Sequence, residues 1–271
     1  MASLSGGRVL LYGGQDPNWA ILNDAYIFTQ SSFSTSSSSQ GDSAGGGTWA
    51  QVADGPGARI GHAMAPLSGG RVLLYGGEGN GNAGNAFIYT PSSPSTLSNG
   101  QRRSAGKGTW IKVADDPGVR YELAMAPLSG EKVLLYGGSQ GNYALNDVWI
   151  YSPPSSTLSN GKGGSAENGT WAQVAVADGP SARSGHAMAG AGDGKVVMYG
   201  GLNDNKQNLG DVWIFHGGLT NPTWTQLTNS VMLPRFGHSM AVLTPLLETT
   251  FHRPQSATVV VFGGTVTYRT F

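Results

Sequence analysis

The stretch "RVLLYGG" at residues 71–77 decides the fold of this 271-residue chain, because the same phrase returns four more times. The other copies are RVLLYGG at 8–14, KVLLYGG at 132–138, KVVMYGG at 195–201 and TVVVFGG at 258–264. The second glycine of each pair stands at 14, 77, 138, 201 and 264, which is a period of 61 to 63 residues. Such a period indicates a repeat protein in which each copy forms one unit that packs against the next.

Each unit holds four short segments, which the third copy shows best. They are YELAMAP at 121–127, KVLLYGG at 132–138, NDVWIY at 146–151 and TWAQV at 170–174. The second segment is apolar at consecutive positions, as in a strand covered on both faces, and the fourth alternates like a half-exposed edge strand. None of these segments has apolar residues at the spacing of an amphipathic helix. Four antiparallel strands per unit predict the blade of a β-propeller.

Several features return together at fixed offsets and make the units resemble kelch repeats. These features are a diglycine after the second strand, an aromatic residue in the third, a tryptophan in the fourth and an arginine before the next unit; one set is Gly137, Gly138, Trp149, Trp171 and Arg183. The resemblance covers nearly the whole chain and implies a propeller that binds protein partners. We expect the diglycine to let the backbone turn beside a bulky aromatic side chain, where a Cβ would collide.

The predicted fold is all-β, a single kelch-type β-propeller domain over 1–271 with about five four-stranded antiparallel blades. Their approximate bounds are 1–52, 59–113, 120–174, 183–227 and 235–271. Met1 aligns with Met64 inside the first strand of a unit, so we expect the first blade to lack most of that strand. Only TVTYRTF follows the last diglycine, so the last blade is also expected to be incomplete. The sequence therefore predicts an open or partial ring.

Three units carry inserts between their third and fourth strands, at 30–47, 91–108 and 152–169. They are too rich in serine and glycine to bury a core, so we expect the fold not to depend on them. The third insert contains Asn168, which begins a possible glycosylation acceptor, NGT.

The charge balance is 16 basic against 16 acidic residues, and cysteine is absent. Without net charge the chain has no global field for nucleic acid or an anionic membrane, so we expect neither as a partner. No apolar run approaches a membrane-spanning length and no secretory signal is visible, which favours a cytoplasmic location.

Three histidines occupy one repeated position, within GHAM, GHAM and GHSM, and the third copy has Leu123 there. They are His62, His186 and His238. A metal site would use histidines that meet, whereas these belong to separate blades, so we predict a structural role. Asp24, Asp147 and Asp211 likewise begin third strands, with Asn85 in the second copy, and we expect them to fix the turn into the strand.

One arginine precedes the first strand of each later unit and should lie near the mouth of the central channel. These arginines are Arg59, Arg120, Arg183 and Arg235. They could bridge to a carboxylate or carbonyl of a neighbouring blade, which we favour, or form a ring that grips an acidic ligand. The copies differ just beyond them, as in RYEL at 120–123 against RIGH and RSGH, and a functional signal should lie in such differences.

Two classes of function remain open, a binding module and the propeller part of a larger enzyme. The fold resembles the central domain of galactose-oxidase-type copper enzymes, whose cofactor requires a cysteine, and that of iron-dependent specifier proteins, which use an E-x-x-x-D-x-x-x-H cluster. The sequence contains neither. We therefore predict a non-catalytic interaction module with no cofactor and no metal site.

We expect a protein or peptide partner, acidic if the arginines grip it. The predicted face consists of the loops at 15–22, 78–84, 139–145 and 202–209 together with the arginine-bearing loops, because loops differ between copies while strands do not. The candidate contact residues are Arg59, Arg120, Arg183, Arg235, Tyr121, Tyr143, Asn142, Asn80 and Trp19.

Overall fold

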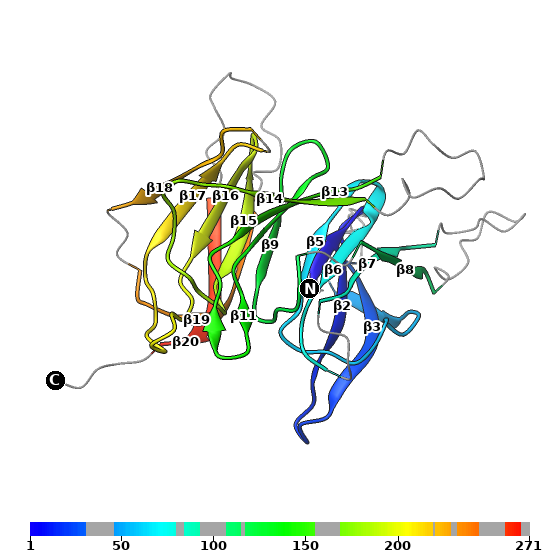
Figure 1. Ribbon diagram of the computed structural model, residues 1–271. Coiled ribbons are helices and arrows are strands. Elements are labelled where there is room, and N and C mark those ends of the chain that lie inside the picture. Colours follow the sequence, from blue (N-terminus) through cyan, green and yellow to red (C-terminus); the bar gives the residue numbers. More distant parts are fainter. Residues whose placement is uncertain are drawn as a thin grey trace, which may run out of the picture.

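The structure is a computed structural model that describes residues 1–30, 46–79, 84–92, 107–114, 117–154, 169–218, 220–228, 232–243 and 258–266. Its regular structure is almost entirely β-strand (Figure 1), apart from the short 3-10 turn η1 (Ser68–Gly70). No helix in these ranges is long and apolar enough to cross a membrane. Asn80, Asn168 and most of each insert lie outside the described residues.

Four antiparallel sheets of four strands follow one another along the chain, each with its strands paired in sequence order. Blade 1 is β1 (Ala2–Leu4), β2 (Arg8–Gln15), β3 (Ile21–Gln30) and β4 (Gly47–Gln51). Blade 2 is β5 (Ala63–Pro66), β6 (Val72–Tyr75), β7 (Ala86–Thr90) and β8 (Thr109–Val113). Blade 3 is β9 (Ala124–Pro127), β10 (Val133–Tyr136), β13 (Val148–Ser152) and β14 (Thr170–Val174). Blade 4 is β15 (Ala187–Gly192), β16 (Lys195–Tyr199), β17 (Val212–His216) and β18 (Thr223–Leu227).

Two smaller pairs of strands complete the described structure. A hairpin of β11 (Ser139–Gln140) and β12 (Tyr143–Ala144) lies in the loop between β10 and β13. A two-stranded sheet of β19 (Phe236–Leu243) and β20 (Thr258–Thr265) packs beside blade 4, where β19 contacts β15. The propeller thus has four full blades and an additional two-stranded sheet.

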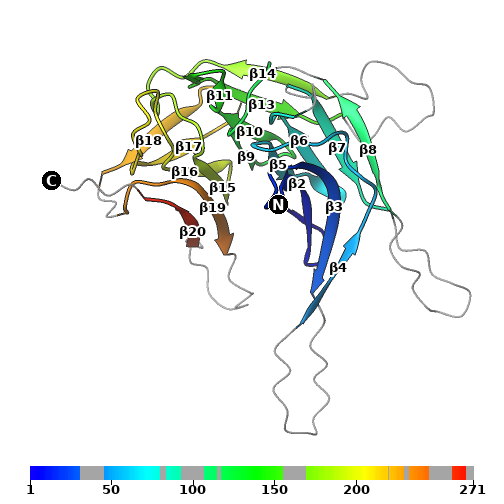
Figure 2. The same ribbon diagram turned by 90° about the horizontal axis from the view of Figure 1, so that it is seen from below.

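The first blade differs from the expectation that it lacks most of its inner strand. Strand β1 is only three residues long, yet it pairs with β2 from Ala2, opposite Leu10, to Leu4, opposite Arg8. The described part of the last unit has two strands, β19 and β20, and its sequence likewise predicts an incomplete blade. Figure 2 shows the sheets arranged around a common axis, with the first and last at the two ends of an arc.

The strand that carries the repeated phrase is buried on both faces because it supplies two blade interfaces at once. In β6, Leu73 packs with Met125 and Leu135 of blade 3, whereas the next residue, Leu74, packs with Leu10 of blade 1. All four residues of β6 are buried. Each such side chain contributes roughly 1.5–3 kcal/mol on burial, so the apolar run is what joins neighbouring blades.

The repeated tryptophan of the fourth strand also links two blades. Trp110 lies between Tyr12 of blade 1 and Tyr89 of its own blade, with ring centroids 5.0 Å away in both cases. Trp171 lies in the same way between Tyr75 and Tyr151, and Trp224 between Tyr136 and Phe215. These spacings are those of favourable aromatic pairs.

The diglycine meets a different obstacle from the one that the sequence predicts. A Cβ on Gly76 would lie 2.6 Å from the main-chain oxygen of Arg120 in the next blade, and Gly76 has a φ of +71°. The nitrogen of Gly77 donates a hydrogen bond of 2.9 Å to that same oxygen. Gly13, Gly137 and Gly200 approach Arg59, Arg183 and Arg235 in the same way. The glycines are therefore required mainly by a main-chain contact between blades. The imidazole ring of the repeated histidine is a further obstacle, 3.1, 3.3 and 2.8 Å from a Cβ on Gly13, Gly137 and Gly200.

Candidate functional site

Arg120 and Arg183, both buried, form ion pairs with the half-buried aspartates that precede the third strand of their own blades, not with a neighbouring blade as the sequence predicts. Nη1 and Nη2 of Arg183 donate to Oδ1 and Oδ2 of Asp211, each at 2.8 Å. Arg120 bonds Asp147 in the same manner at 2.7 and 2.8 Å. Burial opposes ionisation of Asp211, but the hydrogen bonds and charge of Arg183 outweigh it and lower the pKa of this carboxyl. Both guanidinium groups are thus engaged within the blade rather than presented to solvent.

Blade 2 has the arginine without the carboxylate, because Asn85 occupies the aspartate position. Arg59 is fully buried, and its Nη1 donates to the oxygen of Gly76 at 2.9 Å. Its Nη2 makes no hydrogen bond of standard geometry with the described residues, although the hydroxyl of Tyr12 lies close enough to the guanidinium to interact with its charge. The guanidinium lies 5.5 Å from the ring centre of Phe87, where blades 3 and 4 have tryptophan. Burial lowers the pKa of Arg59.

Arg235 precedes the two-stranded sheet and differs from the other three arginines because it is only half-buried. Its Nη1 donates to the oxygen of Gly263 at 3.1 Å.

Four equivalent residues, two places after each arginine, connect the blades around the channel mouth. They are Gly61, Glu122, Gly185 and Gly237, with φ values of 63°, 53°, 62° and 66°. The nitrogen of Glu122 donates to the oxygen of Gly61 at 2.6 Å, Gly185 donates to Glu122 at 2.8 Å, and Gly237 donates to Gly185 at 2.8 Å. We call this series of main-chain bonds the mouth ladder. Glu122 alone bears a side chain there, at a conformational cost of roughly 1–3 kcal/mol.

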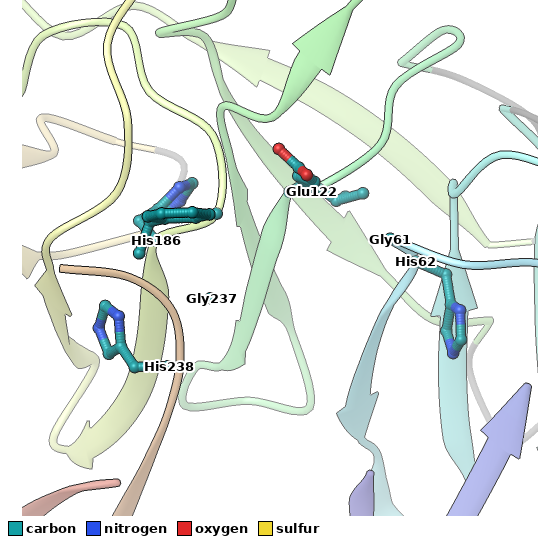
Figure 3. A pocket seen from close by; sticks show the side chains of 9 residues that line it. Gly61, His62, Glu122, His186, Gly237 and His238 are labelled. Atoms are coloured by element: carbon teal, nitrogen blue, oxygen red, sulfur yellow. The ribbon is translucent and has the colours of Figure 1, made fainter. Parts of the chain in front are cut away.

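A pocket of about 240 Å³ opens beside the mouth ladder (Figure 3). Its walls are the four ladder residues together with His62, Leu123, His186, Phe236 and His238. The side chain of Glu122 is exposed, and its Oε2 accepts a hydrogen bond of 2.9 Å from the hydroxyl of Ser184. The mouth therefore carries a carboxylate held by its neighbours.

The three histidines pack against the tyrosine of the preceding unit, with His186 and His238 buried and His62 half-buried. The pairs are His62 with Tyr12, His186 with Tyr136 and His238 with Tyr199, at ring-centroid distances of 5.2, 5.5 and 4.9 Å. Burial lowers the pKa of His62 and of His186 to about 3 and that of His238 to about 4. Figure 3 shows His62 across the pocket from the other two. Within the described ranges no group of three His, Cys, Asp or Glu side chains could hold a metal ion.

The loop face brings together three of the residues that the sequence singles out. Tyr121 pairs through its main chain with Ser139 at the start of the β11–β12 hairpin, and its hydroxyl donates to the oxygen of Gly141. Asn142 and Tyr143 form the exposed tip of this hairpin, and Tyr143 is 74% exposed. Trp19, 79% exposed, lies on the hairpin of blade 1, two blades away.

Asp204 joins the hairpin of blade 3 to the loop of blade 4. Its Oδ1 accepts a hydrogen bond of 2.6 Å from the nitrogen of Ala144. The sequence includes Asp204 in a predicted binding loop without singling it out, because a contact between two loops 60 residues apart leaves no pattern along the chain. We call residues 121–122, 139–144 and 203–207 the loop platform. Figure 1 shows β11 and the β2–β3 hairpin at the same end of the molecule.

The comparisons with known proteins agree with this architecture. The sequence model described as the KLHDC2/KLHL20/DRC7 Kelch-repeats domain matches residues 1–247. Adagio-like protein 1 of Oryza sativa subsp. japonica is 24% identical over 96% of this chain and 37% of its own length. Adagio protein 3 of Arabidopsis thaliana is 26% identical over 64% of this chain and 25% of its own length. The flagellar outer-arm dynein alpha chain of Chlamydomonas reinhardtii is 25% identical over 72% of this chain and 4% of its own length. The chain therefore spans well under half the length of each of these relatives.

Proposed function

This chain belongs to the kelch-repeat family, and we propose that it is a non-catalytic module that binds a protein or peptide partner on the loop platform. The matching domain is a repeat domain, and repeat domains of this kind present loops on a rigid frame for recognition. Fold alone does not specify function, so the proposal depends on the site.

The observation that supports it most is that an exposed tyrosine stands on a platform whose main chain is already hydrogen-bonded. Tyr143 is 74% exposed, while the hairpin beneath it is held by Tyr121 on one side and Asp204 on the other. A rigid aromatic side chain loses little entropy on binding, and such residues dominate protein interfaces. Asn142 adds adaptable hydrogen bonding, and we propose Trp19 and Asn80 as secondary contacts.

The burial of the arginines favours a structural role over direct contact with the partner. Arg59, Arg120 and Arg183 are buried, so we propose that they position the loops by tying them to the blades. An acidic partner, the alternative raised by the sequence, would depend on Arg235, which is half-buried.

Photo-crosslinking tests the proposed face. A photoreactive phenylalanine analogue at position 143 should form a covalent adduct with a partner in an extract of the cells that express this chain. The matched control places the same analogue at Trp49, an aromatic residue 52% exposed on the outer strand β4. An adduct at 143 that is absent at 49 supports the platform, whereas equal adducts or none at 143 would contradict it.

A further inference from the structure

The mouth pocket contains a carboxylate that the repeat itself does not require. Gly61, Gly185 and Gly237 occupy the other positions of the mouth ladder and make the same kind of main-chain bonds without a side chain. Glu122 makes these bonds in a conformation that favours glycine. Its side chain is therefore surplus to the architecture, although Ser184 holds one of its oxygens in place.

The buried walls of the pocket contain two imidazole rings whose hydrogen-bonding groups are only partly used within the described structure. His186 and His238 are 5% and 7% exposed, and their ring nitrogens make no hydrogen bond of standard geometry with the described residues, although the main chains of Tyr136 and Tyr199 lie close enough to interact with them. Burial keeps both rings neutral, with pKa values of about 3 and 4. A neutral imidazole has one acceptor nitrogen, so these walls can receive an N–H group and place no positive charge against it.

The exposed charges around the mouth are mostly acidic. Glu78 and Asp204 are exposed on the loops of the same face, with Lys206 as the exposed basic residue in the described part of those loops, and Asp16 and Arg235 are half-buried there. The guanidinium groups of Arg120 and Arg183 are turned inward and paired. Charged surfaces select partners of complementary charge, so this face favours a cationic ligand.

We infer that the mouth pocket takes the ammonium or guanidinium group of a lysine or arginine in a basic peptide segment, with Glu122 as its counter-ion. The inference deepens the proposed function and depends on it. The pocket, at about 240 Å³, is smaller than the roughly 300–1,000 Å³ of typical small-molecule sites, which suits the head of one side chain. Phe236 in the pocket wall supplies an aromatic surface, which also suits a cation.

Titration of the ¹⁵N-labelled chain with defined peptides tests this inference. The probes are four blocked pentapeptides that differ only at the central residue, which is arginine, lysine, glutamine or glutamate. The arginine and lysine peptides should shift the amide signals of Gly61, Glu122 and Gly185, and the glutamine and glutamate peptides should leave them in place. Replacing Glu122→Gly should weaken binding of the arginine peptide about tenfold, as expected for the loss of a charged hydrogen-bond partner.

The variants separate a lost ligand from a lost fold. Glu122→Gly restores the residue found in the other copies, and its amide spectrum reports directly whether the blades remain intact. Glu122→Gln keeps the size of the side chain and should weaken binding similarly. Asp193→Asn, an exposed position in the turn between β15 and β16 and outside the pocket, should leave binding unchanged. Binding that is equal for the glutamine peptide, or unchanged in Glu122→Gly, would overturn the inference. An adduct at position 143 under those circumstances would leave the platform proposal standing, because Tyr143 does not line the pocket.

Discussion

Arg183 and Asp211 are joined by two parallel hydrogen bonds of 2.8 Å, although 28 residues separate them along the chain. The pair fixes the arginine-bearing loop to the start of β17, and Nη1 of Arg183 also donates to the oxygen of Gly200 at 3.0 Å. Each blade that has both residues is thus tied from its entry loop to its third strand and to its own diglycine.

Replacing Asp211→Asn should lower the free energy of unfolding by about 3 kcal/mol, because the fully buried Arg183 would lose its counter-charge. Denaturant titration measures this loss. The control is Asp193→Asn, an exposed aspartate at a φ of +50° that asparagine tolerates, which should change stability by about 0.5 kcal/mol or less. Similar losses in both variants would mean that the ion pair contributes little.

The converse change, Asn85→Asp, should raise the free energy of unfolding by about 1–2 kcal/mol. It would give Arg59 the carboxylate that Arg120 and Arg183 already have, at a guanidinium whose Nη2 makes no hydrogen bond of standard geometry in the described structure. The midpoint of chemical unfolding is again the measurement. A lower midpoint would show that the guanidinium of Arg59 already has enough polar contacts. Blade 2 would then hold its arginine in a different way from blades 3 and 4.

Gly76→Ala should destabilise the chain far more than Gly141→Ala. Both glycines have positive φ, but a Cβ on Gly76 would lie 2.6 Å from the main-chain oxygen of Arg120, whereas one on Gly141 meets nothing within 4 Å. We expect a loss of about 1 kcal/mol at Gly141 from conformation alone, and at least twice that at Gly76. Equal melting temperatures for the two variants would contradict the contact between blades.

Stability should fall as the pH is lowered from 6.5 towards 4.5. The pKa of His186 is about 3 in the folded chain and near 6.5 when unfolded, so only the unfolded state takes up a proton in this range. Each such histidine then lowers the free energy of unfolding by about 1.4 kcal/mol for every pH unit below 6.5. Asp147 and Asp211, whose pKa values are lowered in the folded chain, also stabilise the fold. That stability is lost only at lower pH, once the pH falls below the ordinary pKa of aspartate.

The variant His186→Leu isolates this effect, since Leu123 fills the same position in blade 3. This variant should lose less stability than the original chain between pH 6.5 and 4.5, while its stability at pH 7.5 should be nearly unchanged. Thermal melts across this range measure both values. An unaltered pH profile would assign the acid sensitivity to other groups.

The repeat made the blades predictable because the strand that carries the repeated phrase recurs in each, fully buried in β6 and β10 of the two inner blades. The position of the tryptophans and the structural place of the histidines also followed from their recurrence. The pairing of each arginine with the aspartate of its own blade did not, although both residues recur. The registers of β9 and of β13 with β10 together bring Asp147 beside Arg120. The first blade kept its inner strand because three paired residues suffice to form β1.

The site was less predictable than the fold. The difference between RYEL and its counterparts drew attention to residues 120–123, but the left-handed conformation of Glu122 is a property of the backbone that the residue type does not reveal. The link from Asp204 to Ala144 depends on the conformation of two loops. Asn80 lies outside the described residues, so its role as a contact remains a prediction.

The contact between each diglycine and the arginine carbonyl of the next unit has a geometric consequence. Because the two groups that meet belong to the main chain, the angular step from one blade to the next does not depend on the size of any side chain at that point. Substitutions in the apolar interfaces should therefore alter how strongly the blades adhere while leaving the curvature of the array the same. The glycines then set the curvature of the array. The outer strands and loops can differ in sequence without changing the radius of the channel.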